Sequence, residues 1–441
     1  MRFRLPGRSR LSLAQVHRDT VVSVFGSFAA QAMVLVSGVL VARMLGVENR
    51  GHLALLWLVA LILGQLGMLG LPLAITYWIA KDPRSARAIM RSLLGPAVVQ
   101  GPLLVALQAG ALLLLVGNEA GPVRLAAVLT LPLIPAMIAQ QYALGILQGQ
   151  RRFRAFNLLR TLPSTLYALA VAALFLLSAG DLPAVALAFT SVYVFAGGGA
   201  IWYAVAGLPR PSTHGGAVPS RGEMVRFGLK GMVGSISPLD TFQLDQAVVG
   251  LFISPAALGF YVVGLAFSNL PRFVAQSIGF VAFPHVAAHT DSAHARRAMW
   301  RFAALALAAC GSIVGVLEAT AGWLVPLFFG DQFSPAIDLA RILLVSALLV
   351  GLRRVLADGA RGAGHPTSGT VAEVVAWASL FPSLAILVPA AGAKGVAVAL
   401  AVSALVGMVT LVVSVMISGR RAPPPPVGPE PSPGLAGQMT P

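Results

Sequence analysis

The side chains best suited to chemistry are ionisable groups set within long apolar stretches of the sequence. Arg272 lies near the middle of the apolar stretch 256–288, and Asn269 precedes it by one helical turn on the same face. A charge at this depth in a membrane is costly and usually has a function. A guanidinium binds phosphate well because it stays charged and donates paired hydrogen bonds. We expect Arg272 and Asn269 to contact an anionic substrate such as one that carries phosphate, or else Arg272 to pair with an internal carboxylate such as Asp245.

Weaker candidates are the other polar residues of the apolar stretches. Arg43 and Arg50 flank a short loop, where they would guide an anionic substrate or remain solvated interfacial charges near Glu48. Gln65 and Gln140 carry amides that suit sugar hydroxyls. A single glutamine in such a stretch more often hydrogen-bonds a neighbouring helix, so both interpretations of these amides stay open.

No set of residues predicts a catalytic or metal centre. His285 and His289 have i, i+4 spacing, with His294 close behind, but no HExxH motif or third ligand accompanies them. We interpret these histidines as a solvated loop cluster. The single cysteine, Cys310, excludes a disulfide framework and a Cys-based zinc site. No Walker motif is present, so ATP hydrolysis would require another chain.

The composition indicates what kind of fold positions these residues. Hydrophobic residues make up 57% of the 441 residues and charged residues 10%, and the mean hydropathy is +0.83. A soluble fold of this size would need about 25% charged residues, and a disordered chain would be far less apolar. The composition therefore predicts an all-α, polytopic membrane protein.

The sequence divides into about twelve apolar stretches, each long enough to span a bilayer as a helix. Proline and glycine recur inside them, as at Gly95-Pro96, Gly101-Pro102 and Pro132, which predicts bent or broken helices around a cavity. The predicted spans are 20–44, 51–80, 88–116, 121–148, 157–179, 182–208, 225–253, 256–288, 296–322, 334–361, 367–391 and 393–417.

The loops predict the orientation of these spans. Of the 31 Lys and Arg residues, 25 fall on the side that also holds both termini. Because cytoplasmic loops are enriched in Lys and Arg, both termini are expected in the cytoplasm. The formal net charge of +16 then reflects topology and attraction to anionic lipids, and no nucleic-acid partner is expected.

The chain is expected to contain two halves and three polar segments. Residues 1–19 form a basic cytoplasmic tail, and residues 20–208 form the N-terminal half with spans one to six. Residues 209–224 are a cytoplasmic linker rich in Pro and Gly, and residues 225–417 form the C-terminal half with spans seven to twelve. Residues 418–441 form a proline-rich tail that need not pack.

The two halves resemble each other. Gly51 and Gly259 lie at matching joins at an offset of 208 residues, and Gly149 and Gly362 match at an offset of 213. Two matches at nearly one offset indicate a duplicated six-span unit, which transporters commonly use.

The segment FGLKGMVGSISPLDTFQLDQAVVGLFISPAALGFYVVGLAFSNLPRFV from Phe227 resembles spans seven and eight of bacterial flippases for polysaccharide and lipid-linked oligosaccharide. WLVPLFFGDQFSPAIDLARILLVSALLVGL from Trp323 and LVARMLGVENRGHLAL from Leu40 are similar to other parts of the same group, the multidrug/oligosaccharidyl-lipid/polysaccharide exporter superfamily. The resemblance implies two six-helix lobes around a cavity and alternating access. The implied cargo is an undecaprenyl-diphosphate-linked sugar moved across the bacterial inner membrane.

The resemblance also bears on individual residues. Related lipid II flippases use cavity arginines, one of them in span eight, as Arg272 would be. Relatives can carry a Na⁺ or H⁺ site built from carboxylates of spans seven and eleven, which here implies Asp240, Asp245 and Glu373. Oxygen ligands suit Na⁺, and a desolvated carboxylate suits H⁺. The alternative is that these carboxylates are structural. No other cofactor is expected.

Several functions remain open at this point. Within the superfamily, a lipid II flippase or a cation-coupled multidrug antiporter is the alternative. Outside it, the alternatives are a polytopic glycosyltransferase, an acyltransferase or a scaffold of an envelope machine. The expected partners are the lipid-linked sugar, membrane lipids, and a polysaccharide polymerase or glycosyltransferases, and the chain is expected to be a monomer.

Overall fold

The computed structural model describes residues 13–208, 219–235, 243–289 and 291–418. Within these residues the chain is helical and contains no strand, so the all-α expectation is confirmed. The described residues do not include 1–12 of the predicted basic tail, 209–218 of the predicted linker, 419–441 of the predicted tail 418–441, or the carboxylate Asp240.

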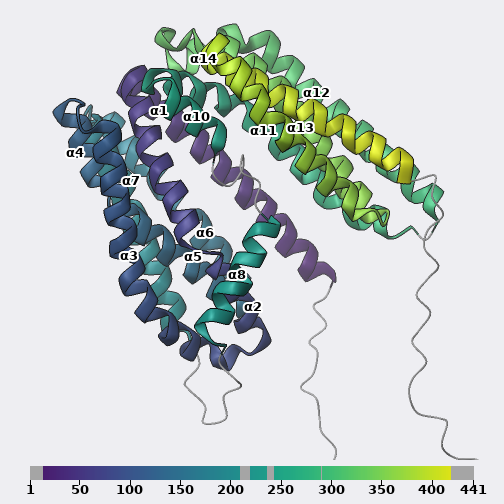
Figure 1. Ribbon diagram of the computed structural model, residues 1–441, viewed down its shortest axis with the longest axis horizontal. Coiled ribbons are helices and arrows are strands. Elements are labelled where there is room, and N and C mark those ends of the chain that lie inside the picture. Colours follow the sequence, from purple (N-terminus) through teal and green to yellow (C-terminus); the bar gives the residue numbers. More distant parts are fainter. Residues whose placement is uncertain (1–12, 209–218, 236–242, 290, 419–441) are drawn as a thin grey trace, which may run out of the picture. The chain divides into compact units, whose positions relative to one another are not determined.

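The helices follow the order of the predicted spans (Figure 1). The first half contains α1 (Leu13–Gly67), α2 (Leu71–Lys81), α3 (Ala86–Val116), α4 (Gly121–Leu129), α5 (Leu133–Gly149), α6 (Phe153–Leu176) and α7 (Leu182–Ala206). The second half contains α8 (Arg221–Ser235), α10 (Leu244–Phe252), α11 (Pro255–Ala287), α12 (Ser292–Phe329), α13 (Ala336–Gly362) and α14 (Pro366–Ser418). Two 3₁₀ turns, Pro83–Ser85 and Asp331–Phe333, join neighbouring helices.

Eight helical stretches of the described chain are long and apolar enough to cross a membrane. Two of them are longer than one span because a single residue separates two helical segments. Gly46 interrupts α1 with φ 72°, and Gly392 interrupts α14 with φ 55°. These positions fall at the predicted joins of spans one and two and of spans eleven and twelve. Glycine is suited to both because a side chain disfavours positive φ.

Proline interrupts the helices less often than expected. The predicted break at Pro132 is present, because α4 ends at Leu129 and α5 begins at Leu133. By contrast, α3 continues through Pro96 and Pro102. Of the expected bent or broken positions, these two prolines therefore do not break the helix. The membrane environment strongly favours a continuous hydrogen-bonded backbone.

Helix α8 begins within the predicted linker 209–224. The Ser220 hydroxyl accepts a hydrogen bond from the Glu223 backbone N–H at 3.2 Å, and Glu223 accepts one from the Ser220 N–H at 2.7 Å. This reciprocal pair is a capping box, and it satisfies donors that the first helical turn leaves free. The bond from the Ser220 N–H holds the pKa of Glu223 below its ordinary value. The Ser-x-x-Glu pattern was readable in the sequence and explains the earlier start.

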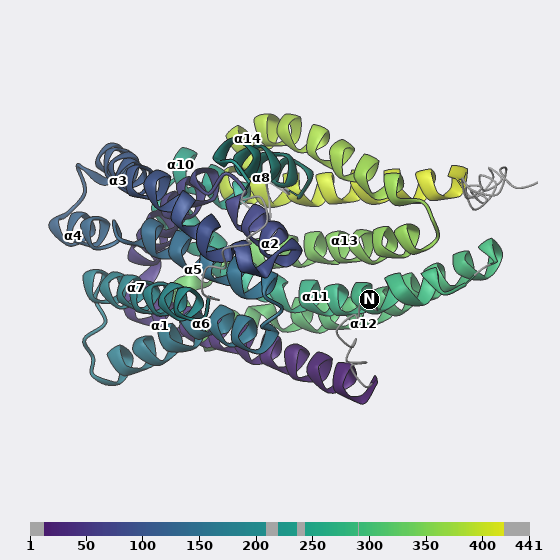
Figure 2. The same ribbon diagram turned by 90° about the horizontal axis from the view of Figure 1, so that it is seen from below.

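The described contacts divide the chain into two compact units. Among the described residues, the first unit comprises those up to 270 together with 315–345 and 384–400, and the second comprises 271–314, 346–383 and those from 401 onward. In the first unit, α5 packs against α2 and α7 around a large apolar core. In the second unit, the segments of α11, α12, α13 and α14 run side by side (Figure 2) and enclose smaller apolar clusters.

Large apolar side chains also cover the outside of the helices. Leu114 is 87% exposed, Leu176 is 81% exposed and Phe195 is 77% exposed. Soluble proteins rarely expose contiguous apolar surface on this scale, whereas lipid-facing helices do.

Equivalent contacts within each unit support the internal repeat. A Cβ added to Gly149 of α5 would lie 2.9 Å from the Thr76 carbonyl oxygen of α2. A Cβ added to Gly362 of α13 would lie 2.7 Å from the Phe283 carbonyl oxygen of α11. The two glycines are 213 residues apart and the two carbonyls 207 residues apart. The same close helix contact therefore occurs once in each half of the sequence.

The first unit also contains a reciprocal contact between the other matched glycines. A Cβ on Gly51 of α1 would lie 1.7 Å from the Pro255 carbonyl oxygen. A Cβ on Gly259 of α11 would lie 2.2 Å from the Val47 carbonyl oxygen. Gly51 thus faces the carbonyl of the residue four positions before Gly259, and Gly259 faces the carbonyl of the residue four positions before Gly51. Such a self-complementary contact is what a local two-fold axis produces.

Replacing Gly51 with alanine is expected to break this contact, because the new methyl group would overlap with backbone atoms. Backbone atoms, unlike side-chain atoms, cannot move aside by changing rotamer. Overpacking of this kind costs about 1–3 kcal/mol or more. We expect faster hydrogen–deuterium exchange in peptides covering residues 47–58 and 255–263. Gly38→Ala in the same helix is the control, because its Cβ would meet nothing within 4 Å. Equal exchange in both variants would refute the contact.

Candidate functional site

Arg272 lies in the middle of α11, as expected, and its side chain is half-buried. Its Nε atom is buried and has no hydrogen-bond partner among the described residues. Asn269 lies one turn earlier and is also half-buried. A buried donor without a partner is costly, because it has lost its bond to water and gained nothing. An anionic oxygen at Nε would supply that bond.

Arg50 also has a buried Nε atom without a partner in the described part of the chain, as does Arg87. Tyr167 lies within electrostatic range of the Arg50 guanidinium. Tyr167 belongs to an aromatic cluster within the first unit. Its ring lies 4.8 Å from that of Phe189, which in turn lies 4.9 Å from Tyr193 and 5.0 Å from Trp57. The cluster joins α1, α6 and α7 beside a cation.

Sequence reasoning missed this aromatic cluster. The ring of Trp57 in α1 packs against Phe189 and Tyr193 of α7. The aromatic residues come from three spans that are more than 100 residues apart at their extremes, so no local spacing connects them. Aromatic rings with hydroxyl groups offer an apolar face and a polar edge together, which suits a sugar ring.

Arg43 has backbone partners. Its Nε donates to the Phe328 carbonyl at 2.7 Å, and its Nη2 donates to the Leu327 carbonyl. Phe328 and Leu327 lie in the last turn of α12, where carbonyls have no partner within the helix. Arg43 therefore caps α12 and connects it to α1 within the first unit.

The glutamines bond backbone carbonyls of neighbouring helices. Gln140 donates to the Leu159 carbonyl at 3.2 Å, and Gln108 donates to the Thr130 carbonyl at 3.1 Å, beside the break between α4 and α5. These contacts correspond to the structural interpretation of the amides. Gln65 is half-buried on α1.

The two described carboxylates of the expected ion site, Asp245 and Glu373, have protein partners. Asp245 is buried and accepts a hydrogen bond from the Tyr261 hydroxyl at 3.0 Å. Glu373 pairs with Arg353 Nη2 at 2.8 Å and accepts a bond from Trp377 Nε1 at 3.0 Å. Sequence analysis did not predict the pair between Glu373 and Arg353, because the two residues lie on different predicted spans and no local spacing connects them.

The second unit therefore holds Glu373 and Arg353 as a neutralised pair. The Arg353 side chain is only 13% exposed, and its Nη1 is buried without a partner among the described residues. A Cβ on Gly407 of α14 would lie 2.9 Å from Nη1, so the small residue leaves room for the guanidinium. A cation at Glu373 would have to compete with Arg353.

Removing one member of this pair is expected to destabilise the second unit. Arg353→Met or Glu373→Gln should each cost about 1–3 kcal/mol, less than a fully buried pair because Glu373 is 37% exposed. The double variant should regain part of the loss, as measured by thermal unfolding in detergent.

The control for this cycle is the exposed pair of Lys394 and Asp338, whose Nζ and Oδ2 lie 2.6 Å apart. Lys394→Met with Asp338→Asn should show a coupling below about 1 kcal/mol. Additive losses at Arg353 and Glu373 would mean that the two side chains do not stabilise each other.

The long apolar helices and their apolar outer surface are those of a polytopic membrane protein. Residues 16–289 match the family described as polysaccharide biosynthesis protein, and the chain belongs to this family. The fold is similar to that of transporters of the multidrug/oligosaccharidyl-lipid/polysaccharide exporter superfamily. No sequence match was found among curated proteins.

Three solved structures share the fold. The lipid II flippase MurJ in an inward closed conformation matches with a TM-score of 0.71 at 13% identity, over 90% of this chain and 89% of that chain. A multidrug resistance MATE family transporter matches in its inward-facing conformation with a TM-score of 0.61 at 17% identity, over 88% and 94% of the two chains. An outward-facing MATE structure matches with a TM-score of 0.60 at 16% identity, over 91% and 95%.

Proposed function

We propose that this protein is a flippase that moves an undecaprenyl-diphosphate-linked oligosaccharide across the bacterial inner membrane by alternating access, for synthesis of surface polysaccharide. The observation that carries the proposal is Arg272, an arginine in the middle of a membrane-spanning helix whose buried Nε lacks a partner among the described residues. A diphosphate is the part of such a substrate that a guanidinium binds best.

The chemistry of this substrate also fits Arg50 and its aromatic neighbours. A lipid-linked oligosaccharide carries phosphate charges beside sugar rings. Arg50 provides a cation, and Tyr167 and Tyr193 provide rings with hydroxyl groups. In this proposal Arg272 binds the diphosphate, Asn269 assists it, and the cluster around Arg50 contacts the sugar during part of the transport cycle.

A second candidate within the superfamily is lipid II as the substrate. The likeness to the lipid II flippase MurJ favours it, since that match has the highest TM-score of the three described. Lipid II carries the same polyprenyl diphosphate with a different sugar and peptide, so the role of Arg272 would be the same. Loading proteoliposomes with each substrate separately distinguishes the two candidates.

Replacing Arg272 is expected to abolish transport while the protein still folds. Loss of a buried charged partner of the substrate costs at least about 2 kcal/mol of binding free energy. The Arg272→Ala variant in proteoliposomes should therefore flip a fluorescent undecaprenyl-diphosphate-linked sugar at least about 30-fold more slowly than the wild type. Arg272→Lys should keep part of the activity, because it retains the charge without the paired donors.

The matched control for this measurement is Arg124→Ala, which removes an exposed arginine of α4. It should leave the flipping rate unchanged. Wild-type flipping by Arg272→Ala, at equal protein level and thermal stability, would remove the basis of the proposal.

We further propose that transport is coupled to Na⁺ or H⁺ through the carboxylates Asp240, Asp245 and Glu373. The contact of Glu373 with Arg353 makes Glu373 available to a cation only when the pair opens. Dissipating a Na⁺ or H⁺ gradient across the vesicle should slow flipping if the coupling exists. A rate that is independent of both gradients would eliminate the coupling and leave the assignment of Arg272 untouched.

A further inference from the structure

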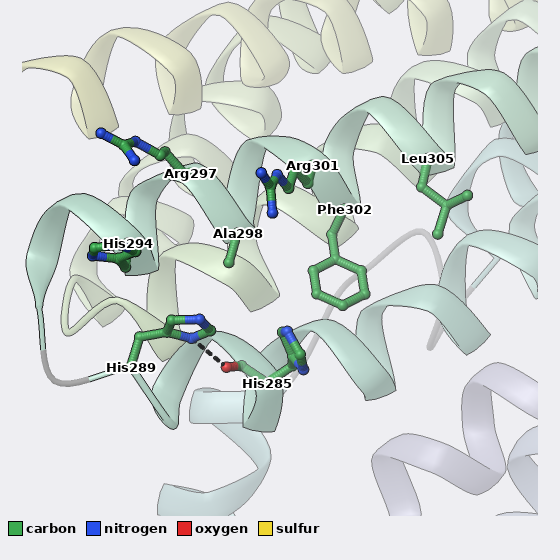
Figure 3. Close-up of a pocket in the computed structure, with 8 residues that line it drawn as sticks. All are labelled: His285, His289, His294, Arg297, Ala298, Arg301, Phe302 and Leu305. Carbon is green, nitrogen blue, oxygen red and sulfur yellow. Dashed lines mark hydrogen bonds between the residues drawn. The ribbon is translucent and has the colours of Figure 1, made fainter.

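A basic pocket lies in the second unit, where α11 ends and α12 begins. It has a volume of ≈ 380 Å³, within the range of about 300–1,000 Å³ that is usual for small-ligand sites. Figure 3 shows its lining, which comprises His285, His289, His294, Arg297, Ala298, Arg301, Phe302 and Leu305. None of these residues takes part in the proposed transport site, and the sequence analysis interpreted the histidines as a solvated loop cluster.

The lining residues of α12 form one face of that helix. His294, Arg297, Arg301 and Leu305 follow the spacing i, i+3, i+7 and i+11, which places them along a single stripe. The stripe begins in the first turn of α12, where the helix dipole favours an anion. Charged side chains occupy its first two turns, and apolar side chains follow deeper in the span.

The charge of the pocket is positive and largely uncompensated. No ion pair in the described part of the chain involves Arg297 or Arg301, and no acidic side chain lines the pocket. The nearest carboxylate in the sequence, Asp291, bonds His294 Nδ1 and the Ala293 backbone N–H. These bonds, with that from His294 the larger effect, hold the pKa of Asp291 below its ordinary value. The Asp291 carboxylate therefore already has hydrogen-bond partners at the start of α12.

The histidines are held in place by contacts within the pocket. His289 Nδ1 lies 2.9 Å from the His285 carbonyl oxygen (Figure 3). A carbonyl only accepts, so Nδ1 carries the proton in this bond, and Nε2 can donate to an anion when the ring is doubly protonated. The His285 ring packs edge-on against Phe302 with centroids 5.3 Å apart. The ring contact between His285 and Phe302 joins the end of α11 to the start of α12 around the pocket.

A metal ion does not suit this pocket. The described residues contain no group of three His, Cys, Asp or Glu side chains placed to hold a metal. Two arginines beside the histidines would also repel a cation. An oxyanion that takes hydrogen bonds from guanidinium and imidazole groups is the ligand that the lining favours.

The apolar side of the pocket indicates where that oxyanion comes from. Leu305, which is 54% exposed, and Phe302 line the pocket at the far end of the stripe. A free phosphate ion would use the cationic end and leave this apolar surface unused. A phospholipid would place its phosphate among the arginines and its acyl chains along Leu305 and Phe302.

We propose that this pocket binds the phosphate headgroup of an anionic phospholipid, at the end of the spans that the sequence assigns to the cytoplasm. The basic residues Arg297 and Arg301 contact the phosphate, and His285 and His289 complete the site from α11. Basic pockets between membrane helices are suited to such headgroups. The lipid then links the adjoining ends of α11 and α12, independently of the transported substrate.

The test uses native mass spectrometry of the full chain in detergent, titrated with phosphatidylglycerol or with zwitterionic phosphatidylcholine. The wild type should bind phosphatidylglycerol more tightly. Because each basic residue contributes about fivefold, the double variant Arg297→Gln, Arg301→Gln should lose about 30-fold in affinity. Arg296→Gln is the matched control, since it removes a neighbouring exposed charge that does not line the pocket. Its affinity should be that of the wild type.

Two further measurements distinguish the sources of the phosphate and check folding. Inorganic phosphate and glycerol phosphate at the same concentration should not displace the lipid, and Leu305→Gln should weaken lipid binding. Arg297→Lys with Arg301→Lys should fold and keep most of the affinity. Equal loss in Arg296→Gln and the double glutamine variant would overturn the proposal, and so would full displacement by inorganic phosphate.

Discussion

The structure depends on one constraint, which is that hydrocarbon offers no hydrogen bonds to the backbone. Every N–H and C=O group within the membrane needs a partner from the protein, so the spans are helices. Where a helix is interrupted, side chains must supply the hydrogen bonds that the backbone lacks. Gln108 reaches the Thr130 carbonyl where α4 ends, and Arg43 reaches two carbonyls where α12 ends. Side chains that look like substrate ligands in the sequence therefore complete the backbone of a neighbouring helix.

The same constraint gives the small residues their positions. Helices that cannot rely on a hydrophobic force between them associate through close packing, and glycine permits the closest approach. Gly149 and Gly362 make equivalent contacts in the two halves, and Gly51 and Gly259 contact each other reciprocally. The duplication is thus visible as repeated packing geometry, even though the aligned sequences share few identical residues.

The arginines of the described helices fall into two groups. Arg43 and Arg353 have carbonyl or carboxylate partners, and their contacts join helices. Arg272 and Arg50 each have a buried Nε without a partner among the residues that the structure describes. A buried donor of this kind needs an explanation in a native protein, and a ligand that uses the donor of Arg272 is the explanation on which the proposed flippase rests. The arginines of the lipid pocket belong to neither group, because they are exposed at a helix end.

The sequence by itself determined the all-α class, the order of the spans and most of their ends. Length, hydropathy and the positions of Gly46 and Gly392 are local properties, and a membrane span needs only local hydrogen bonds. It also predicted Arg272 at membrane depth, because depth follows from position within a span. Only the tertiary structure decided which polar groups meet. Glu373 pairs with Arg353, and aromatic rings from three spans pack together near Arg50. These contacts join residues 20 to more than 100 positions apart. The sequence could not predict them, because no local pattern fixes the rotation of each helix about its own axis.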